Sequence, residues 1–312
     1  MNLINIDSLK FNLEPIPNFV VLLSTYNGEH YLRKQIYSIF NQENVRVSLI
    51  VRDDGSTDGT LIILKEMAVN FPITIIEGAN IGSTQSYFEL LRRASTLKFE
   101  FIAFADQDDY WHKNKLSVPS KIYKEKKFNM YSSKRNLWVS KKKHKKIFPK
   151  QILIPSFLNS CFENICAGCT IVVSRKFFES RISPILTLQL DVVHYDSLLY
   201  TLAVDAGNLF FDSNAYLDYR LHNANQVGIS KSLVNRAKNL NKYIESQFRY
   251  IDFLKKTSEL QLSEENRKIL HCLTSSEKLN LKKYPFSTFS RFRQSKIENI
   301  YIRNLLRRLK ST

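Results

Sequence analysis

The amino-terminal third of the chain alternates short apolar runs with amphipathic segments, and this alternation restricts the possible folds more than any other feature. The run FVVLLSTYN is followed by GEHYLRKQIYSIF, in which Leu32, Ile36, Ile39 and Phe40 recur at helical spacing. The runs VRVSLIV, ITIIEG and FEFIAFA follow at similar intervals, with helical segments between them. Strands that alternate with amphipathic helices form parallel sheets covered by helices. The sequence therefore predicts an α/β fold.

Each of the four apolar runs ends in a polar cluster. These clusters are STYNG, RDDGSTDG, EGANIG and ADQDD. In parallel sheets ligands bind beyond the carboxyl ends of the strands, so we expect the four loops to converge on one crevice. Taken alone, DDGSTD is an ordinary turn and helix cap. The prediction of a site therefore depends on the convergence of all four loops.

The last cluster places two carboxylates, Asp106 and Asp108, one residue apart after a predicted buried strand. Such hard oxygen ligands suit Mg²⁺ or Mn²⁺, which can bridge to a diphosphate and act as a Lewis acid on a leaving phosphate. No G-x-G-x-x-G follows the first strand and no G-x-x-x-x-G-K-[ST] occurs anywhere in the sequence. The dinucleotide fingerprint and the P-loop are thus both missing, which argues against a dehydrogenase or an NTPase.

The motifs together resemble a known enzyme family. VVLLSTYNGEHYLRKQIYSIFNQ, LIVRDDGSTDGTLIIL, EGANIG and FADQDDYWHKNKL resemble the nucleotide-sugar half of family 2 glycosyltransferases, which have the Rossmann-like GT-A fold. AGCTIVVSRKFFE, HYDSLLYTLAVDAG and YRLHNANQVG resemble the acceptor half, especially that of bacterial rhamnosyltransferase-like members. The implied organisation is an extension at 1–18, a GT-A domain at 19–228 with halves 19–115 and 116–228, and a basic helical region at 229–312.

The resemblance also implies roles for individual residues around the donor. The positions that match nucleotide-binding positions are Thr25, Tyr26, Asp53, Asp54 and Asp106. One carboxylate of the Asp53–Asp54 pair would accept a hydrogen bond from the base imide, while the other turns away. Asp108 would ligate the metal directly, Asp106 would lie near ribose and metal, and His222 would reach the metal or diphosphate. A buried, satisfied histidine is the alternative for His222.

Asp196 matches the carboxylate that deprotonates the acceptor hydroxyl in inverting members of the family. The family usually has His-Asp or Glu-Asp here, whereas this chain has Tyr195 before the aspartate. Asp109 and Trp111 would border the acceptor, where an aromatic face can stack on a sugar, and Arg220 would offset charge on the diphosphate. A place in the core is the alternative for Trp111.

The implied activity is inverting, metal-dependent transfer of a sugar from dTDP-rhamnose or a UDP-hexose to a glycan acceptor in bacterial surface polysaccharide or lipooligosaccharide synthesis. A catalytically degenerate nucleotide-sugar-binding subunit is one alternative, although the intact D-x-D and Asp196 argue against it. A nucleic-acid-binding protein would explain the net charge of +17, but four acidic loops would repel phosphates without metal. We expect a nucleotide sugar, a glycan that can be lipid-linked, and an anionic membrane surface as partners, and no nucleic acid.

Neither the amino terminus nor the cysteines indicate secretion. The segment MNLINIDSLKFNLEPIPN lacks the basic start and long apolar stretch of a signal peptide, and no apolar run is long enough to cross a bilayer. Cys161, Cys166, Cys169 and Cys272 fit reduced thiols. The C-x-x-C at Cys166 can be half of a zinc or redox site, but no second pair has suitable spacing, so packing as small apolar groups is favoured. We expect a cytoplasmic location, with peripheral attachment to the inner membrane face as an open alternative.

Two basic segments bear on that alternative. The run Lys141, Lys142, Lys143, Lys145 and Lys146 has no apolar periodicity and predicts a solvated loop or hairpin tip that can also touch membrane phosphates. The segment SKIENIYIRNLLRRLKS predicts a basic amphipathic helix with Ile297, Tyr301, Leu305 and Leu309 at helical spacing. Such a helix either packs on the catalytic domain or attaches to an anionic membrane.

Overall fold

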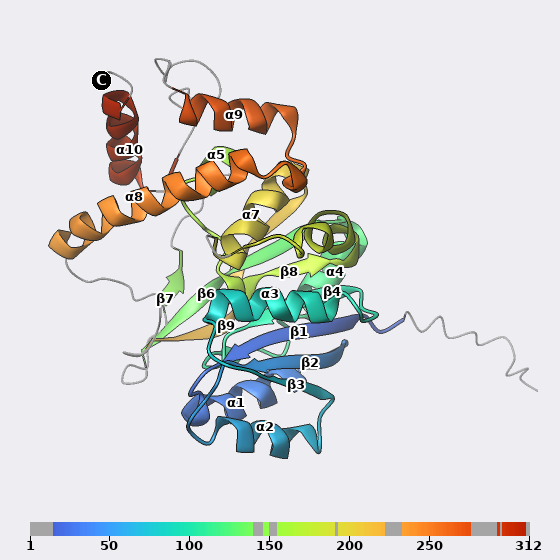
Figure 1. Cartoon of the computed structure of the whole chain (residues 1–312). Coiled ribbons are helices and arrows are strands. Elements are labelled where there is room, and N and C mark those ends of the chain that lie inside the picture. The colour runs from blue at the N-terminus through green and yellow to red at the C-terminus, as the bar shows by residue number, and fades with distance from the viewer. Residues whose placement is uncertain are drawn as a thin grey trace, which may run out of the picture.

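A nine-stranded mixed sheet forms the centre of the protein (Figure 1). The computed structural model describes residues 15–139, 146–149, 155–190, 193–221, 233–275, 292–293 and 295–309. The first four strands run parallel and are β1 (Asn18–Thr25), β2 (Arg46–Asp53), β3 (Ile73–Glu77) and β4 (Phe101–Ala105). Their spatial order is β3-β2-β1-β4, so the chain moves outward from β1 and then returns to its other side. Such a reversal of strand order marks the place where ligands bind in α/β sheets.

The second half of the chain extends this sheet beyond β4. β8 (Val172–Ser174) pairs antiparallel with β4, and β6 (Met130–Val139) pairs antiparallel with β8. β9 (Leu209–Leu221) runs parallel to β6 and antiparallel to the short β5 (Tyr110–Trp111). β7 (Lys146–Phe148) pairs antiparallel with β6. Of the lysine run between β6 and β7, only Lys146 lies within the described residues.

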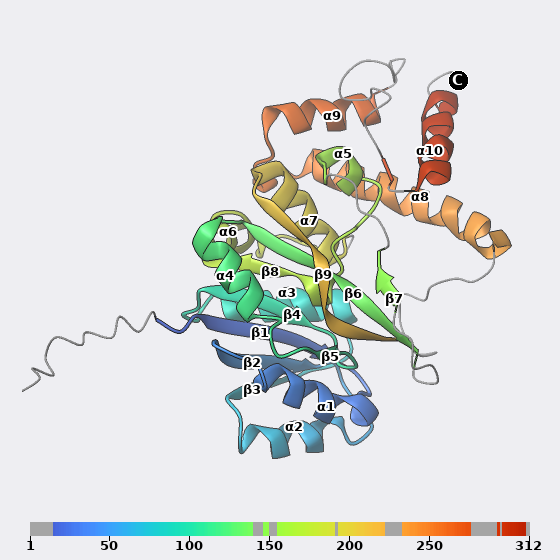
Figure 2. The ribbon, with the colours of Figure 1, turned by 180° about the vertical axis from the view of Figure 1, so that it is seen from behind.

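Helices cover both faces of the sheet (Figures 1 and 2). One face packs against α1 (Glu29–Phe40), α2 (Thr60–Ala68) and α4 (Ser117–Glu125), and the other against α3 (Ser83–Ala94) and α7 (Tyr195–Ala206). Strand β1 shows why: Val21 and Leu23 join the core beneath α1 and α2, whereas Val20 and Leu22 join the core beneath α3 and α7. Successive strand residues point to opposite faces, so a fully apolar strand needs cover on both. The predicted α/β fold is confirmed.

The carboxyl-terminal helices continue the core on the α3 and α7 side. They are α8 (Leu233–Lys256), α9 (Glu264–Thr274) and α10 (Lys296–Leu309). Leu254 of α8, Leu270 of α9 and Leu306 of α10 belong to the same apolar cluster as Leu198 of α7. The shorter helical segments are α5 (Phe157–Ser160), α6 (Arg175–Phe177), Gly168–Thr170, Phe178–Ile182, Ser183–Ile185 and Ser258–Leu260. None of the described helices combines the length and hydropathy that crossing a bilayer requires.

Candidate active site

The loops after the parallel strands leave the sheet at one edge. Thr25 at the end of β1 is the register partner of Asp53 at the end of β2, and Leu23 is the partner of Ala105 at the end of β4. The predicted polar clusters therefore begin beside one another. Hydrogen bonds between these loops then fix their relative positions.

Gln107, the middle residue of the D-x-D, joins the β4 loop to the β1 loop. Its Oε1 accepts hydrogen bonds from Thr25 Oγ1 at 2.6 Å and from the Tyr26 backbone N–H at 2.9 Å, and its Nε2 donates to the Tyr26 carbonyl at 3.2 Å. A Cβ at Gly28 would lie only 2.5 Å from Gln107 Oε1, so this close approach requires glycine. The sequence analysis missed Gln107, because nothing in a D-x-D pattern identifies the partner of its central side chain.

Replacing Gln107 with Met keeps the length of the side chain and removes all three hydrogen bonds. We expect kcat/KM for the donor to fall by up to about a hundredfold, because small displacements of reacting groups have effects of that order. Gln42→Met is the matched control, since Gln42 also bridges loops through its amide, to the His112 carbonyl and the Leu116 N–H. The control should lower the melting temperature and leave kcat/KM unchanged. A wild-type kcat/KM in the Gln107 variant would contradict a positioning role.

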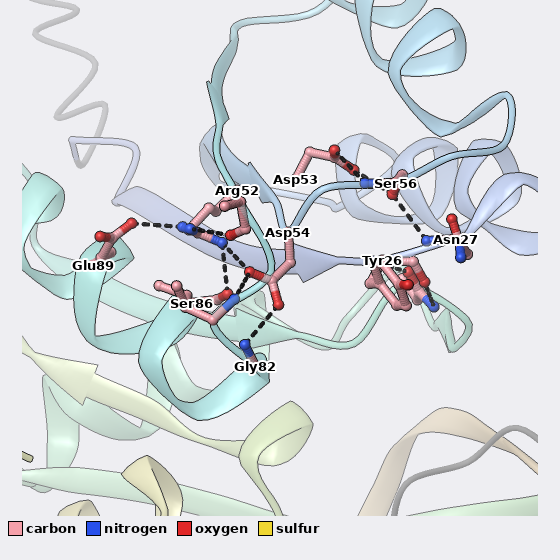
Figure 3. Close-up of polar contacts among 12 residues, drawn as sticks. Tyr26, Asn27, Arg52, Asp53, Asp54, Ser56, Gly82, Ser86 and Glu89 are labelled. Atoms are coloured by element: carbon pink, nitrogen blue, oxygen red, sulfur yellow. Dashed lines mark hydrogen bonds and ion pairs between the residues drawn. The ribbon is translucent and has the colours of Figure 1, made fainter. Parts of the chain in front are cut away.

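Asp53 holds the β2 loop against the β1 loop (Figure 3). Its carboxylate accepts hydrogen bonds from the Ser56 N–H at 2.9 Å and the Ser56 hydroxyl at 2.5 Å. Ser56 Oγ in turn accepts the Asn27 N–H at 2.9 Å, and Asn27 Oδ1 accepts the Thr57 N–H at 2.8 Å. Asn27 has a φ of 48°, a left-handed conformation that asparagine tolerates better than most residues. Buried Asp53 is thus a structural anchor as well as a candidate nucleotide contact.

Asp54 points in a different direction, toward the start of α3 (Figure 3). Its carboxylate accepts the Ile81 N–H at 2.8 Å and the Gly82 N–H at 2.9 Å, and it forms an ion pair with the buried Arg52 guanidinium. Arg52 also bonds to Glu89 at 2.6 Å. A carboxylate at a helix N-terminus is favoured by the exposed N–H groups there. The two side chains diverge, but which of them meets the nucleotide base stays a prediction.

The carboxylates of the D-x-D lie in a crowded acidic cluster. The pKa of Asp106 is raised to about 7, first by burial and then by the charges of Asp108 and Asp196. Burial also raises the pKa of Asp196. The Tyr87 hydroxyl donates to the Ala105 carbonyl at 2.7 Å and also lies 3.3 Å from Asp106 Oδ1. Like charges held together out of water are unfavourable unless a cation neutralises them, so these residues fit a divalent ion.

Asp109 and Cys169 lie deeper in the same cluster. Within the described residues, ligand atoms of Asp106, Asp109 and Cys169 all lie within 4.8 Å of one another. Asp109 Oδ1 accepts the Arg220 N–H at 3.4 Å, whereas its buried Oδ2 has no hydrogen-bond partner among the described residues. Burial raises the pKa of Asp109 well above its usual range. All four cysteines are free thiols, and Cys169 lies beside these carboxylates.

Asp196 reaches the cluster from the first turn of α7. Its Oδ1 accepts the Ser197 N–H at 2.8 Å, and the Gly168 backbone also hydrogen-bonds to its carboxylate. The neighbouring Tyr195 ring stacks on Tyr87 with centroids 4.0 Å apart. A Cβ at Gly168 would lie 1.9 Å from the Tyr195 hydroxyl, so only glycine fits there. Tyr195 thereby connects Asp196, the candidate base, to the tyrosine that lies beside Asp106.

Arg220 meets the opposite side of the D-x-D. Its Nε donates to the Asp108 carbonyl at 3.0 Å, and its guanidinium lies 4.1 Å from the centroid of the Trp138 ring and 4.9 Å from that of Tyr31. Trp138 on β6 was missed in the sequence, because YSSKRNLWV lacks the apolar alternation of a half-buried strand. His222 lies outside the described residues.

Trp111 lies in the core and not at the surface of the protein. It is 1% exposed, and the Lys115 Nζ lies 3.9 Å from the centroid of its ring. Burial lowers the pKa of Lys115 to about 8. The ring therefore presents no face on which a sugar can stack, and the core alternative describes it. The strand β5 turns it inward, where large aromatic side chains contribute most to stability.

Comparisons with known proteins agree with this geometry. The model of the family described as "Glycosyl transferase family 2" matches residues 20–180. The dTDP-rhamnosyl transferase RfbG of Shigella flexneri is 29% identical over 226 residues, which are 70% of this chain and 78% of that protein. The glucosyltransferase WfgD of Escherichia coli, named for UDP-Glc and a GlcNAc-diphosphoundecaprenol, is 28% identical over 157 residues; the match spans 50% of this chain and 59% of WfgD.

Solved structures show the same fold at lower sequence identity. Residues 1–349 of Staphylococcus aureus TarS with UDP-GlcNAc align with a TM-score of 0.54 and 17% identity, covering 82% of this chain and 80% of that one. The mannosyltransferase PcManGT of Pyrobaculum calidifontis, with GDP-Man and Mn²⁺, aligns with a TM-score of 0.55 and 16% identity, covering 83% and 69%. The chain belongs to glycosyltransferase family 2, is a glycosyltransferase, and has a GT-A fold with a helical carboxyl-terminal part.

Proposed function

We propose that this glycosyltransferase transfers a sugar with inversion from a nucleotide-sugar donor to a glycan acceptor of a bacterial surface polysaccharide, with Mg²⁺ or Mn²⁺ as cofactor. The observation that carries the proposal is that Asp106 follows β4, beside the end of β1, and lies near enough to Asp108 and Asp196 for their charges to raise its pKa. RfbG and WfgD favour dTDP-rhamnose as donor and a UDP-hexose as the alternative. WfgD, named for a lipid diphosphate, favours a lipid-linked acceptor.

The side chains divide the proposed reaction between them. Asp196 accepts the proton of the acceptor hydroxyl while that oxygen forms a bond to the anomeric carbon and the bond to the nucleoside diphosphate breaks. A carboxylate with a raised pKa is a stronger base, provided that it is ionised at the working pH. Asp106 and Asp108 would hold the ion, which supplies positive charge for the departing diphosphate. Arg220, bonded to the Asp108 carbonyl, adds positive charge at the same edge.

The test is thermal unfolding of the full chain with nucleotides, with and without Mn²⁺ or Mg²⁺. A ligand that binds only the folded state raises the melting temperature. We expect dTDP or UDP to raise it only when the metal is present. If no nucleotide changes it with either metal, the proposed donor site is contradicted. If stabilisation comes from nucleic acid in a salt-sensitive manner, the nucleic-acid alternative is supported instead.

The raised pKa of Asp106 predicts how stability depends on pH without metal. Between the ordinary value of 3.8 and about 7, the folded protein binds a proton at Asp106 that the unfolded chain releases. The contribution of Asp106 to stability therefore falls as pH rises through this window. Because other groups titrate there too, the measurement is the difference in melting temperature between Asp106→Asn and wild type. In metal-free buffer the advantage of the variant should grow from about pH 4 to about pH 7, and saturating Mn²⁺ should abolish it; a pH-independent difference would contradict the assignment.

A further inference from the structure

Helix α10 has two apolar faces, and only one of them packs on the protein. Ile302 and Leu306 are buried in the main core. Ile297 is 81% exposed, Ile300 58% and Tyr301 39%, and their spacing of three and four residues places them on one side of the helix. The sequence pattern grouped Ile297 and Tyr301 with Leu305 and Leu309 as a single apolar face. We call Ile297, Ile300 and Tyr301 the outer stripe of α10.

The chain's positive charge is concentrated around this stripe in the sequence. Residues 229–312 contain 19 of the 46 Lys and Arg but only 7 of the 29 Asp and Glu, so 12 of the 17 net positive charges lie there. Lys296, at the start of α10, is exposed. Such a charge excess favours an anionic partner and disfavours a second copy of the same region, because two like-charged surfaces repel. An apolar stripe in a basic region is the pattern of a helix that lies on a membrane surface.

Helix α10 lies on the side of the molecule toward which the parallel strand β1 runs (Figures 1 and 2). In both views β1 runs toward the side on which β7 and α10 lie, and the loops of the candidate site follow the carboxyl ends of the parallel strands (Figures 1 and 2). β7 itself exposes Lys146 and Ile147, the latter at 52%. The lysine run directly precedes Ile147 in the sequence. Two apolar and basic segments, far apart in the chain, therefore lie on the side toward which the carboxyl ends of the parallel strands point (Figures 1 and 2).

We propose that the outer stripe of α10, together with β7, docks on an anionic phospholipid bilayer. The isoleucine side chains enter the boundary between headgroups and acyl chains, while the surrounding lysines and arginines lie at the anionic headgroups. Nucleic acid would satisfy the charge but leave the apolar stripe in water. Docking turns the edge with Asp106, Asp108 and Asp196 toward the membrane. The presentation of a lipid-linked acceptor there rests on the proposed function, whereas the docking surface does not.

The experiment is co-sedimentation of the full chain with vesicles of phosphatidylcholine alone or mixed with phosphatidylglycerol. We expect binding only to the mixed vesicles, weakened by high salt. Ile297→Asn with Ile300→Asn should lower the partition coefficient by at least about tenfold, since each buried isoleucine contributes substantially to membrane affinity. The matched control is Ile62→Asn, because Ile62 is 65% exposed on α2, far along the sequence from the proposed surface. The control should bind as wild type does.

Three outcomes would overturn the proposal. The first is that the wild-type chain does not bind mixed vesicles, and the second is that the double variant binds them as tightly as wild type does. The third is that the wild-type chain binds no vesicles but forms a dimer in light scattering, and that the double variant is a monomer. Metal-dependent stabilisation by dTDP or UDP is measured on the same double variant and should be unchanged. That measurement separates the two proposals, because a protein without a donor site would fail it whether or not it binds vesicles.

Discussion

Asp196→Asn is expected to lower kcat by about 10²-fold to 10⁴-fold, the range that a general base contributes, while nucleotide and metal still stabilise the protein. The amide has the size of the carboxylate and can still accept the Ser197 N–H, but it cannot take the proton of an acceptor hydroxyl. Release of nucleoside diphosphate in the presence of acceptor measures kcat, and thermal unfolding measures donor binding. Together they assign Asp196 to chemistry rather than to donor binding.

The matched control for Asp196 is Asp205→Asn on the same helix. Asp205 forms an ion pair with Arg181 at 2.7 Å, and it also accepts hydrogen bonds from Ser263 and Asn266. Removing a charge from a buried pair leaves the partner uncompensated, so this variant should unfold at a lower temperature. Its kcat should stay at the wild-type level. If Asp196→Asn behaved like Asp205→Asn, Asp196 would be a structural residue and the base would lie elsewhere.

Asp108→Asn is expected to abolish the metal-dependent stabilisation by nucleotide and to lower kcat by at least about a hundredfold. The loss corresponds to about 3 kcal/mol of the stabilisation that a metal ion gives a leaving group. The cluster of Asp106, Asp109 and Cys169 provides a sharp alternative location for the ion. Asp109→Asn distinguishes these two locations of the ion. If Asp108 holds the ion, this variant should keep the metal-dependent stabilisation by nucleotide. The reason is that the raised pKa of Asp109 favours its neutral carboxyl form, which an amide imitates. If Asp109→Asn abolished the metal dependence and Asp108→Asn kept it, the ion would lie beside Cys169.

The parts of the fold with strong local patterns could be predicted from the sequence. The parallel strands β1 to β4 are nearly continuous apolar runs, and the helices between them repeat at helical spacing, so neither needs distant contacts to be recognised. The strands of the carboxyl-terminal half were harder to predict from the sequence. β6 contains the polar run SSKRN, and β5 has two residues, so both owe their strand conformation to pairing with β9. The locations of the two tryptophans also depend on this pairing: Trp111 on β5 is buried, whereas Trp138 on β6 is only partly buried.

The candidate site shows the same division. Asp106, Asp108 and Asp196 could be named from motifs, and the structure places the charges of Asp108 and Asp196 close enough to raise the pKa of Asp106. Gln107, Ser56 and Gly168 could not be named, because their importance lies in contacts between loops that are distant in sequence. Motifs identify residues that meet a ligand, whereas the residues that position them depend on tertiary packing.

The shared core of α3, α7 and the carboxyl-terminal helices sets the smallest fragment that can fold. The family match ends at residue 180, yet Ile251, Leu270 and Ile302 pack in the same cluster as Leu91 and Leu202. A chain cut after residue 228, at the end of the GT-A domain implied by the motifs, would leave this apolar surface of α7 in water and invite aggregation. Truncation is therefore the wrong way to separate catalysis from the proposed membrane docking in this enzyme. Substitutions on the outer stripe of α10 separate the two without opening the core.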